Sequence, residues 1–368
     1  MQTRTFGSLD GLRALSIIGV IWLHAWIVSP FYQKLQSMPI LREGGFGVQV
    51  FFTISGFLIT TLLLREKHKS GQISLRAFYI RRTLRIWPLY YSTLGLYILL
   101  VLFIQRGTGR DTVFFHYLPG YLTFTYTWFT GWNVSSAIFT FGWSLSVEEQ
   151  FYFLWAPVLR FLRGFWPALV MFLLIAIRLS ALYGVLWRVM PAASLPGRIA
   201  ANISIAICLG VLLALALDSE RFFKFAWGIL GNKWAAPCAL ILLLLSLIPR
   251  SGHWVELAQA ATLPLFVGAC VVREDNGLAP FLKLRPLAYI GTVSYGMYML
   301  NTLTLDCLHP ILKRIGIENP VITFIPFLIM TVAVASLSYR YFESPFLKLK
   351  DRFSQLRPAT GKTEVAPA

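Results

Sequence analysis

GLRALSIIGVIWLHAWIVSP, residues 11–30, holds one arginine and one histidine among mostly apolar side chains. In a helix, a stretch of this length extends about 30 Å, the thickness of the hydrocarbon core of a bilayer. The whole chain is similar, since 57% of its 368 residues are hydrophobic, 13% are charged and the mean hydropathy is +0.64. A soluble domain carries roughly 25% charged residues. The composition predicts an all-α polytopic membrane protein and excludes a soluble globule, a disordered chain and a small disulfide scaffold.

Ten segments of the chain are long and apolar enough to form a bundle of about ten transmembrane helices. An eleventh candidate, 117–130, is short and rich in Thr and Tyr, which favours an interfacial or re-entrant segment. The ten spans are expected at about 11–30, 45–64, 87–104, 143–160, 166–186, 199–217, 232–248, 255–272, 287–308 and 321–342.

The positive charge of the chain predicts its orientation. The formal net charge is +17, and most Lys and Arg residues fall between the apolar segments. With ten crossings and a cytoplasmic N-terminus, the inside segments hold about twice as many Lys and Arg residues as the outside segments, as the positive-inside rule requires. We therefore expect a multi-pass protein of the inner (cytoplasmic) membrane, with both termini cytoplasmic and no nucleic-acid partner. A membrane domain is expected at 1–345 and a polar, disordered cytoplasmic tail at 346–368.

Ionisable residues inside apolar segments are the first candidates for function in a membrane protein. Arg13 and His24 are eleven residues apart in the first segment, so both lie on one helix face, about 16 Å apart along the axis. Arg13 is expected near the cytoplasmic end and His24 in the outer half. The alternative is that Arg13 snorkels to lipid headgroups and His24 caps a neighbouring carbonyl.

A second polar motif, WSLSVEEQFY at 143–152, places Glu148 in the outer half of its span, at a depth similar to that of His24. A carboxylate beside an imidazole fixes its tautomer and raises its basicity, which is an arrangement suited to general-base catalysis. Glu149 could be a second partner. The alternative is that one of the two glutamates pairs with Arg178 of the next span.

Two further stretches combine polar or small residues with apolar ones. In RAFYIRRTLRIWPLYY, residues 76–91, Arg82 and Arg85 face the same way and suit phosphate groups, although anionic lipid headgroups would also bind them. In GGFGVQVFFTISGF, residues 44–57, the glycines predict close helix packing, and Gln49 and Ser55 add polarity.

Six motifs, in this order and with ten spans, resemble acyltransferase family 3, the integral-membrane acyltransferases that modify bacterial cell-surface carbohydrates. The resemblance covers about residues 6–346. It rests on LDGLRAL followed by His24 at the Arg-x10-His spacing, GVQVFFTISGFLI, RRTLRIWPLY, WSLSVEEQFY, SYGMYML and RYFESP.

The resemblance implies roles for individual residues. Arg13 and His24 would be the essential pair, with His24 as the catalytic centre, and Glu148 would belong to a Ser-x-Glu motif. Arg82 and Arg85 would contact the phosphates of an acyl-coenzyme A on the cytoplasmic side. Supporting or substrate-binding roles are expected for other residues of the same motifs: Asp10, Ser55, Ser146, Tyr295 and Glu343.

One position departs from the family pattern, because Asn301 stands where many relatives have a histidine after S-Y-x-x-Y-x-x. This puts any role of a second histidine in doubt. Some family members also carry a fused extracytoplasmic hydrolase-like domain. No such domain is seen in this sequence, so we expect the chain to act alone or with a separate extracytoplasmic partner.

These observations predict a membrane O-acyltransferase. An acyl group, in the first instance acetyl, would pass from cytoplasmic acetyl-CoA or another acyl-CoA to a hydroxyl of a cell-surface sugar, polysaccharide or glycolipid such as lipopolysaccharide. His24 would act as general base, or would carry the acyl group transiently. No metal is expected, since the four cysteines lack zinc-site spacing. The alternatives are a glycolipid or polysaccharide transporter or flippase without chemistry, which the lack of a visible internal repeat weakens, and a structural or regulatory membrane subunit.

Overall fold

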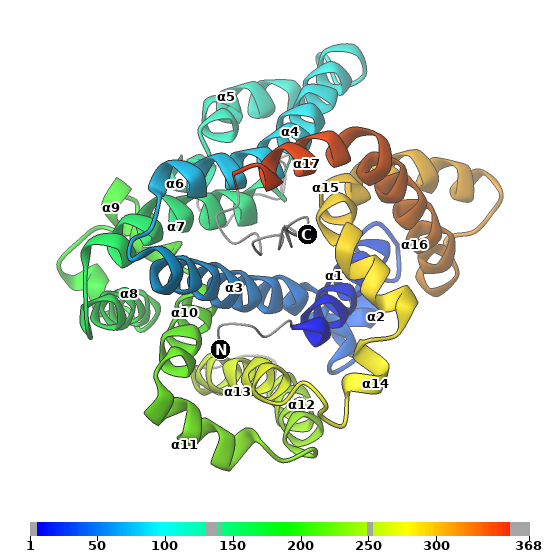
Figure 1. Ribbon diagram of the computed structural model, residues 1–368. Coiled ribbons are helices and arrows are strands. Elements are labelled where there is room, and N and C mark those ends of the chain that lie inside the picture. Colours follow the sequence, from blue (N-terminus) through cyan, green and yellow to red (C-terminus); the bar gives the residue numbers. More distant parts are fainter. Residues whose placement is uncertain (1–5, 130–137, 140, 249–252, 354–368) are drawn as a thin grey trace, which may run out of the picture.

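The computed structural model describes residues 6–129, 138–139, 141–248 and 253–353. Helices and the turns between them make up this part of the chain, and no strand occurs in it. Many of the long helices run side by side, with α3 (Gly47–Ser70) near the middle of the assembly (Figure 1). The all-α class predicted from the composition is confirmed.

Each of the ten apolar segments contains a helix. Short helices connect or follow them: α2 (Tyr32–Gln36), η1 (Leu41–Phe46), α5 (Arg110–Leu122), α6 (Tyr126–Phe129), η2 (Leu186–Arg188), α9 (Leu195–Ala201), α11 (Glu220–Leu230), α14 (Ala279–Leu282), η3 (Ser338–Glu343) and α17 (Ser344–Asp351). The helices in the expected spans are α1 (Gly7–Ile27), α3, α4 (Leu75–Phe103), α7 (Gly142–Phe161), α8 (Trp166–Leu182), α10 (Ile205–Asp218), α12 (Ala235–Ser246), α13 (His253–Val272), α15 (Arg285–Arg314) and α16 (Pro320–Leu337).

Five helical stretches within the described ranges are long and apolar enough to cross a membrane on their own: Gly7–Ile27, Leu41–Ser70, Leu75–Phe103, Trp254–Val272 and Pro320–Lys350. The bent pairs α9–α10, with an angle of 58°, and α11–α12, with an angle of 79°, raise the number to seven if each pair is one span. These helices are those of a multi-pass membrane protein. The count of ten crossings and the cytoplasmic position of the termini stay predictions.

The outer face of α16 is apolar where a soluble protein would be polar. Val321, Ile322, Ile325 and Ile329 are 49% to 64% exposed on this helix. A contiguous exposed apolar surface of this kind suits a lipid environment rather than water.

The segment 117–130 is divided between α5 and α6, with residue 130 outside the described part of the chain.

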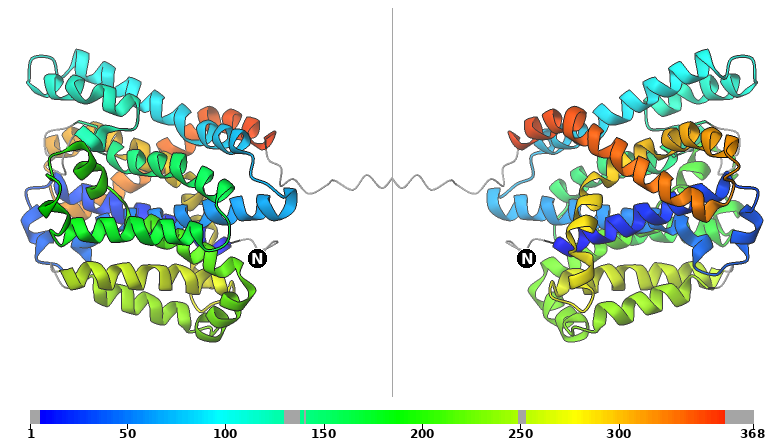
Figure 2. Two further views of the ribbon diagram at one scale, coloured as in Figure 1. Left: turned by 90° about the vertical axis from the view of Figure 1, so that its left-hand side faces the viewer. Right: turned by 90° about the vertical axis from the view of Figure 1, so that its right-hand side faces the viewer.

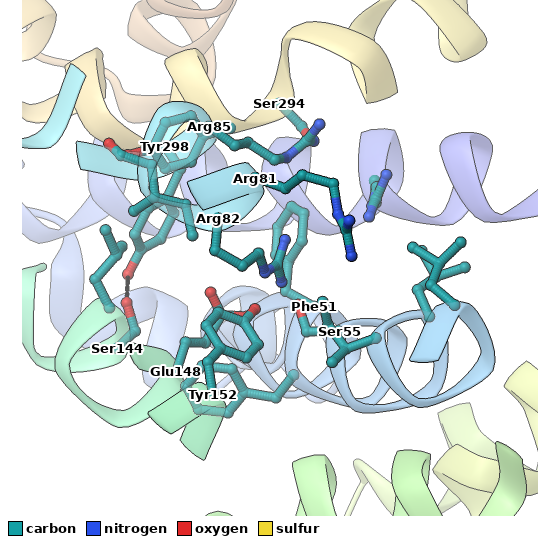
Figure 3. Close-up of a pocket in the computed structure, with 18 of the residues that line it drawn as sticks. Phe51, Ser55, Arg81, Arg82, Arg85, Ser144, Glu148, Tyr152, Ser294 and Tyr298 are labelled. Carbon is teal, nitrogen blue, oxygen red and sulfur yellow. Dashed lines mark hydrogen bonds between the residues drawn. The ribbon is translucent and has the colours of Figure 1, made fainter. Parts of the chain in front are cut away.

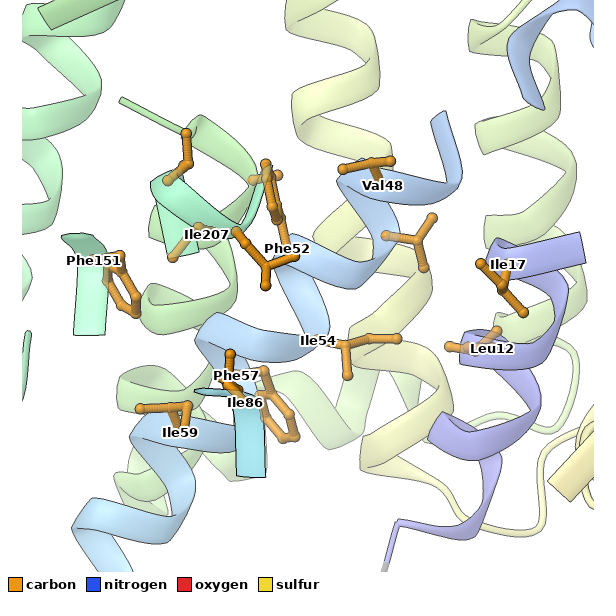
Figure 4. Packing of buried hydrophobic residues seen from close by; sticks show 14 of the residues in the cluster. Leu12, Ile17, Val48, Phe52, Ile54, Phe57, Ile59, Ile86, Phe151 and Ile207 are labelled. Carbon is orange, nitrogen blue, oxygen red and sulfur yellow. The ribbon is translucent and has the colours of Figure 1, made fainter. Parts of the chain in front are cut away.

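Small residues bring the central helices together, as the sequence predicted for 44–57. A Cβ on Gly56 would lie 2.3 Å from the carbonyl oxygen of Ile207, so α3 and α10 cross nearly backbone to backbone. A Cβ on Gly47 would lie 2.3 Å from the carbonyl oxygen of Ser16 on α1. Around these crossings, apolar side chains of α1, α3, α4, α7 and α10 form one continuous core (Figure 4).

The first turn of α1 and helix α17 lie at the same end of the bundle, whereas α2 and η1 lie at the opposite end (Figure 2). Of the predicted tail at 346–368, the first residues belong to α17, and residues 354–368 lie outside the described part of the chain. The chain therefore begins and ends its described course on one face, next to the start of α4.

Candidate functional site

A cavity of about 430 Å³ opens between α1, α3, α4, α7 and α15 (Figure 3). Its volume lies within the roughly 300–1,000 Å³ typical of small-molecule sites. Cationic side chains outnumber acidic ones in its lining. The polar and charged residues of the lining are Arg13, Ser55, Glu66, Arg81, Arg82, Arg85, Ser144, Glu148, Tyr152, Ser294, Tyr295, Tyr298 and Lys350.

Three arginines of α4 extend into the same space (Figure 3). The side chain of Ser74 caps the start of α4 by accepting a hydrogen bond from the backbone of Ala77. Arg82 and Arg85 share a helix face, as their spacing predicted. Arg81 lines the cavity as well and was missed by the sequence analysis, although its four-residue spacing from Arg85 also indicates a shared face.

Arg81 is held by a carboxylate. Its Nη2 donates to Oε2 of Glu66 at 2.7 Å, and Oε1 of Glu66 accepts the backbone N–H of Ser74 at 2.8 Å. The Glu66 side chain is 2% exposed. This carboxylate therefore joins the end of α3 to the start of α4 and fixes one wall of the cavity.

Arg82 is placed differently, because part of its guanidinium has no acceptor. Its Cζ lies 4.0 Å from the ring centroid of Tyr152, and its Nε is buried without a hydrogen-bond partner in the described part of the chain. Buried donors are normally paired. A phosphate oxygen is the kind of acceptor that a guanidinium in this position would bind.

Glu148 lies inside this cationic cavity. Its carboxylate is near the hydroxyl groups of Ser55 and Tyr152 and interacts electrostatically with Arg82 and Arg13 (Figure 3). The face of α7 that carries Glu148 is directed at α3 and α4. The expected pairing of Glu148 with His24 is therefore wrong, because equal depth along two helices does not turn their faces toward each other.

The alternative pairing of these glutamates is contradicted too. Glu149 is 4% exposed and accepts a hydrogen bond from Nε1 of Trp87 at 3.1 Å. Arg178 interacts electrostatically with Glu256 of α13 rather than with either glutamate of α7. Glu149 therefore links α7 to α4 by a hydrogen bond and does not line the cavity.

His24 is hydrogen-bonded to Asn301. Its Nδ1 lies 2.6 Å from Oδ1 of this amide. The amide nitrogen of Asn301 donates to the carbonyl oxygens of Met297 at 3.2 Å and Tyr298 at 2.6 Å. Tyr298 lines the cavity, and its hydroxyl is hydrogen-bonded to Ser144 (Figure 3). His24 thus lies one helical turn beyond the cavity wall, on the side away from Arg81.

Two predicted supporting residues lie beside Arg85. Tyr295 lines the cavity, and its hydroxyl donates to the carbonyl oxygen of Ile86 at 2.7 Å. Glu343 accepts a hydrogen bond from the hydroxyl of Ser338 at 3.1 Å and interacts electrostatically with Arg85. Glu343 ends the π-helix η3, and such helices are frequent at functional sites.

The other supporting residues differ in their surroundings. Asp10 forms an ion pair with Arg13 at 3.5 Å, and Arg13 lines the cavity. Ser55 also lines the cavity. The hydroxyl of Ser146 donates to the carbonyl oxygen of Gly142 in its own helix at 2.9 Å, and the side chain is fully buried. Ser146 is thus turned away from the space that Glu148 faces.

A second cavity, of about 390 Å³, lies near the start of α3, between α3, α7, α8, α10 and α13. No motif of the sequence pointed to it, apart from the polarity of Gln49. Within the described ranges, no group of three His, Cys, Asp or Glu residues is arranged to hold a metal ion. The polar residues of this second lining are Glu43, Gln49, Arg178, Asn202, Ser204, Glu256 and Gln259.

Comparison with known proteins adds a relationship that covers nearly the whole chain. O-acetyltransferase OatA of Staphylococcus aureus (strain NCTC 8325 / PS 47) is 28% identical over 382 residues, which are 94% of this chain and 58% of OatA. A provisionally named O-acetyltransferase of S. aureus (strain COL) is 26% identical over 401 residues, covering 97% of this chain and 60% of the relative. The chain thus spans less than two thirds of the length of these relatives. No solved structure matches it.

A family of acyltransferase domains matches residues 6–340, which include α1 with Arg13 and His24, the arginines of α4 and the polar face of α15. The match ends within η3, directly after α16. The chain therefore belongs to acyltransferase family 3.

Proposed function

We propose that the protein transfers an acetyl group from cytoplasmic acetyl-CoA to a hydroxyl of a cell-surface sugar, polysaccharide or glycolipid. The observation that carries the proposal is the cavity itself. It joins a cluster of arginines at one end to Tyr298, whose own turn of α15 holds the partner of His24. The names of the relatives add O-acetyl transfer as the reaction type.

The cationic end of the cavity suits the phosphates of the donor. Arg82 and Arg85 would bind them, with Arg81 and Lys350 adding positive charge near α17. Apolar side chains, including Leu58, Leu62 and Phe78, line the same cavity and suit the pantetheine arm. Because this end lies on the face of the bundle that carries the first turn of α1 and α17, cytoplasmic termini would expose it to cytoplasmic acetyl-CoA.

The chemistry of the proposal needs one base. His24 removes the proton from the acceptor hydroxyl, and the oxygen attacks the carbonyl carbon of the thioester. A C–O bond forms, the C–S bond breaks, and the coenzyme A thiolate takes the proton from the imidazolium. An alcohol and acetyl-CoA thus give an acetyl ester and free coenzyme A, with His24 regenerated. In the inner membrane, the donor thioester would reach His24 from the cytoplasmic side and the acceptor hydroxyl from the outer side.

The test is coenzyme A release by the purified protein in detergent, with labelled acetyl-CoA and a mixture of bacterial envelope glycolipids as acceptor. Wild type should release coenzyme A and label the glycolipid. His24→Ala should lower the rate by about 10²- to 10⁴-fold, the usual contribution of a general base, with the protein still folded and monodisperse. A His24→Ala protein of normal activity overturns the role of His24.

The same preparation decides against the alternative without chemistry. Wild-type protein that binds no acetyl-CoA, but moves a fluorescent glycolipid across a vesicle membrane without a donor, would support a transporter or flippase and overturn the transferase. A separate extracytoplasmic partner belongs to the proposal as well. It predicts that addition of an envelope extract stimulates transfer to the acceptor and leaves acetyl-CoA binding unchanged.

A further inference from the structure

The hydrogen bond between His24 and Asn301 determines which ring nitrogen of His24 is free. An amide presents one acceptor oxygen and two N–H donors. Both donors of Asn301 are used, because its Nδ2 lies 3.2 Å from the carbonyl oxygen of Met297 and 2.6 Å from that of Tyr298. Turning the amide over would point its oxygen at two carbonyl oxygens. The oxygen Oδ1 therefore faces His24, and it can only accept.

The consequence for His24 follows directly. Its Nδ1, 2.6 Å from Oδ1 of Asn301, must carry the hydrogen of this bond. In the neutral imidazole the other nitrogen, Nε2, then has an unshared lone pair. A neutral histidine with a free Nε2 is the form that can take a proton from a hydroxyl.

The helices that carry His24 and Asn301 are packed closely against each other. Asn301 is fully buried in α15, and α1 packs against α15. The two helices cross closely, since a Cβ on Gly291 of α15 would lie 2.1 Å from the carbonyl oxygen of Asp10 on α1. Such a crossing leaves little freedom for one helix to slide along the other. Packing of α1 against α15 thus limits the relative movement of the two helices that carry His24 and Asn301.

The turn of α15 that orients His24 is the turn that closes the cationic cavity. Tyr298 accepts from Asn301 through its carbonyl oxygen, and its ring lines the cavity. Its hydroxyl is hydrogen-bonded to Ser144 of α7 and donates to the carbonyl oxygen of Phe141 at 3.3 Å. The end of the cavity and the tautomer of His24 therefore depend on the same five residues of one helix, Met297 to Asn301.

We propose that Asn301 is a positioning residue, which holds neutral His24 as the Nδ1–H tautomer so that Nε2 accepts the proton of the acceptor hydroxyl. Asn301 thereby does for His24 what the sequence analysis assigned to Glu148. Glu148 instead lines the cationic cavity. The inference rests on the proposed function only for its effect on turnover, since the tautomer itself is independent of any substrate.

The first measurement is the ¹⁵N NMR spectrum of the protein labelled at its five histidines, in detergent and without substrates. The His24 signals are identified by their loss in His24→Ala. Wild type should show a neutral His24 protonated at Nδ1. Asn301→Leu should convert His24 to the Nε2–H tautomer or to a mixture of the two tautomers. Leu fills the volume of Asn301 but cannot accept a hydrogen bond from Nδ1. A wild-type His24 that carries its hydrogen on Nε2 overturns the inference.

The second measurement is steady-state turnover of acetyl-CoA. Asn301→Leu should lower kcat by about 10- to 100-fold, the usual cost of losing an orienting partner, and leave KM for acetyl-CoA unchanged. Asn301→Asp keeps an acceptor oxygen for Nδ1 of His24, and as the protonated acid its other oxygen can donate to the carbonyl oxygen of Tyr298, so this variant should recover most of the lost rate. Thr304→Val is the matched control, because Thr304 is buried in the same helix and its hydroxyl bonds only to the carbonyl oxygen of Leu300 among the described contacts.

The outcomes separate the inference from the proposed function. If wild type releases no coenzyme A under any condition, the proposed function fails, and the NMR spectrum alone decides the tautomer. If wild type is active and Asn301→Leu keeps its full kcat, the positioning role fails while the transferase stands. If Asn301→Leu does not fold, Asn301→Asp still tests the inference. The inference requires that His24 in Asn301→Asp is the Nδ1–H tautomer and that this variant is highly active.

Discussion

The two ends of α1 differ in the number of side chains that surround their candidate functional residue. Around Arg13, four further cations line one cavity: Arg81, Arg82, Arg85 and Lys350. Around His24, a single amide sets the geometry. A polyanionic ligand can be held by several charges that replace one another in part, whereas proton transfer needs one nitrogen in one orientation. Substitutions at the two ends should therefore fail in different kinetic terms.

The largest effect on donor binding is expected from Arg82→Ala combined with Arg85→Ala. Each hydrogen bond to a charged group contributes about 1.5–3 kcal/mol, so the loss of one bond from each arginine should raise KM for acetyl-CoA by about 10²-fold or more, with a smaller change in kcat. Steady-state kinetics with His24→Ala alongside gives the comparison. A double variant that loses kcat at unchanged KM would contradict the division between the two ends.

Arg76→Ala is the matched control for that experiment. Arg76 lies on the same helix near the same end of the bundle, but it is exposed and does not line the cavity. If α4 used its arginines mainly to bind anionic lipid headgroups, Arg76→Ala would raise KM for acetyl-CoA as much as the cavity variants do. We expect its KM to equal that of wild type.

A smaller effect, and one on stability rather than on kinetics, is expected for Gly56→Ala. The new Cβ would lie 2.3 Å from the carbonyl oxygen of Ile207, so α3 and α10 must move apart. Overpacking of this kind costs about 1–3 kcal/mol and should lower the apparent Tm of the protein in detergent. Gly95→Ala on α4 is the control, because within the described part of the chain no atom beyond its own stretch of helix lies within 4 Å of the added Cβ. Equal Tm values for both variants would show that the crossing is not tight.

Glu66→Gln should have a weaker effect, which is confined to the cationic end. The substitution keeps an acceptor for the backbone of Ser74 but removes the charge that holds Arg81 at 2.7 Å. We expect KM for acetyl-CoA to rise by a few fold, equivalent to about 1 kcal/mol. The control is Glu220→Gln, whose partner Lys224 and own side chain are both largely exposed. A loss of kcat in Glu66→Gln would show that Arg81 takes part in the chemistry instead.

The smallest effect is expected for Ser146→Ala, although Ser146 belongs to the Ser-x-Glu motif. Its hydroxyl is satisfied by the carbonyl oxygen of Gly142 within α7, and hydrogen bonds of this kind contribute little to a helix. Both KM and kcat should stay near wild type. Ser144→Ala, on the cavity side of α7, is measured for comparison. A strong loss of activity in Ser146→Ala would show that the catalytic site lies on the other face of α7.

Much of the architecture could be predicted from local pattern. Each of the ten apolar segments contains a helix, and Gly47 and Gly56 lie at close crossings of α3 with α1 and α10. The spacing of Arg82 and Arg85 was enough to place both on one face. These predictions succeeded because they depend on residues within a few turns of one helix, where 3.6 residues per turn relates sequence to direction.

The pairing of His24 shows where this reasoning ends. Depth along a helix can be calculated from residue numbers, and it made Glu148 look like the natural partner. The rotation of α7 about its own axis is set by its neighbours, and it turns Glu148 toward Ser55 and Arg82. The signal that could have found Asn301 was its departure from the histidine of the family motif, on a helix where Tyr295 was already a candidate.

By itself, the sequence determined the membrane class of this protein, its family and the chemical character of each helix face, because composition, periodicity and motif spacing are local properties. Only the tertiary structure decided which faces meet. It placed Glu148 with the cations, gave His24 an amide partner 277 positions away in the chain, and bound Arg81 to Glu66 across the start of α4. Such contacts depend on how helices rotate and cross, and that is settled by the packing of all side chains together.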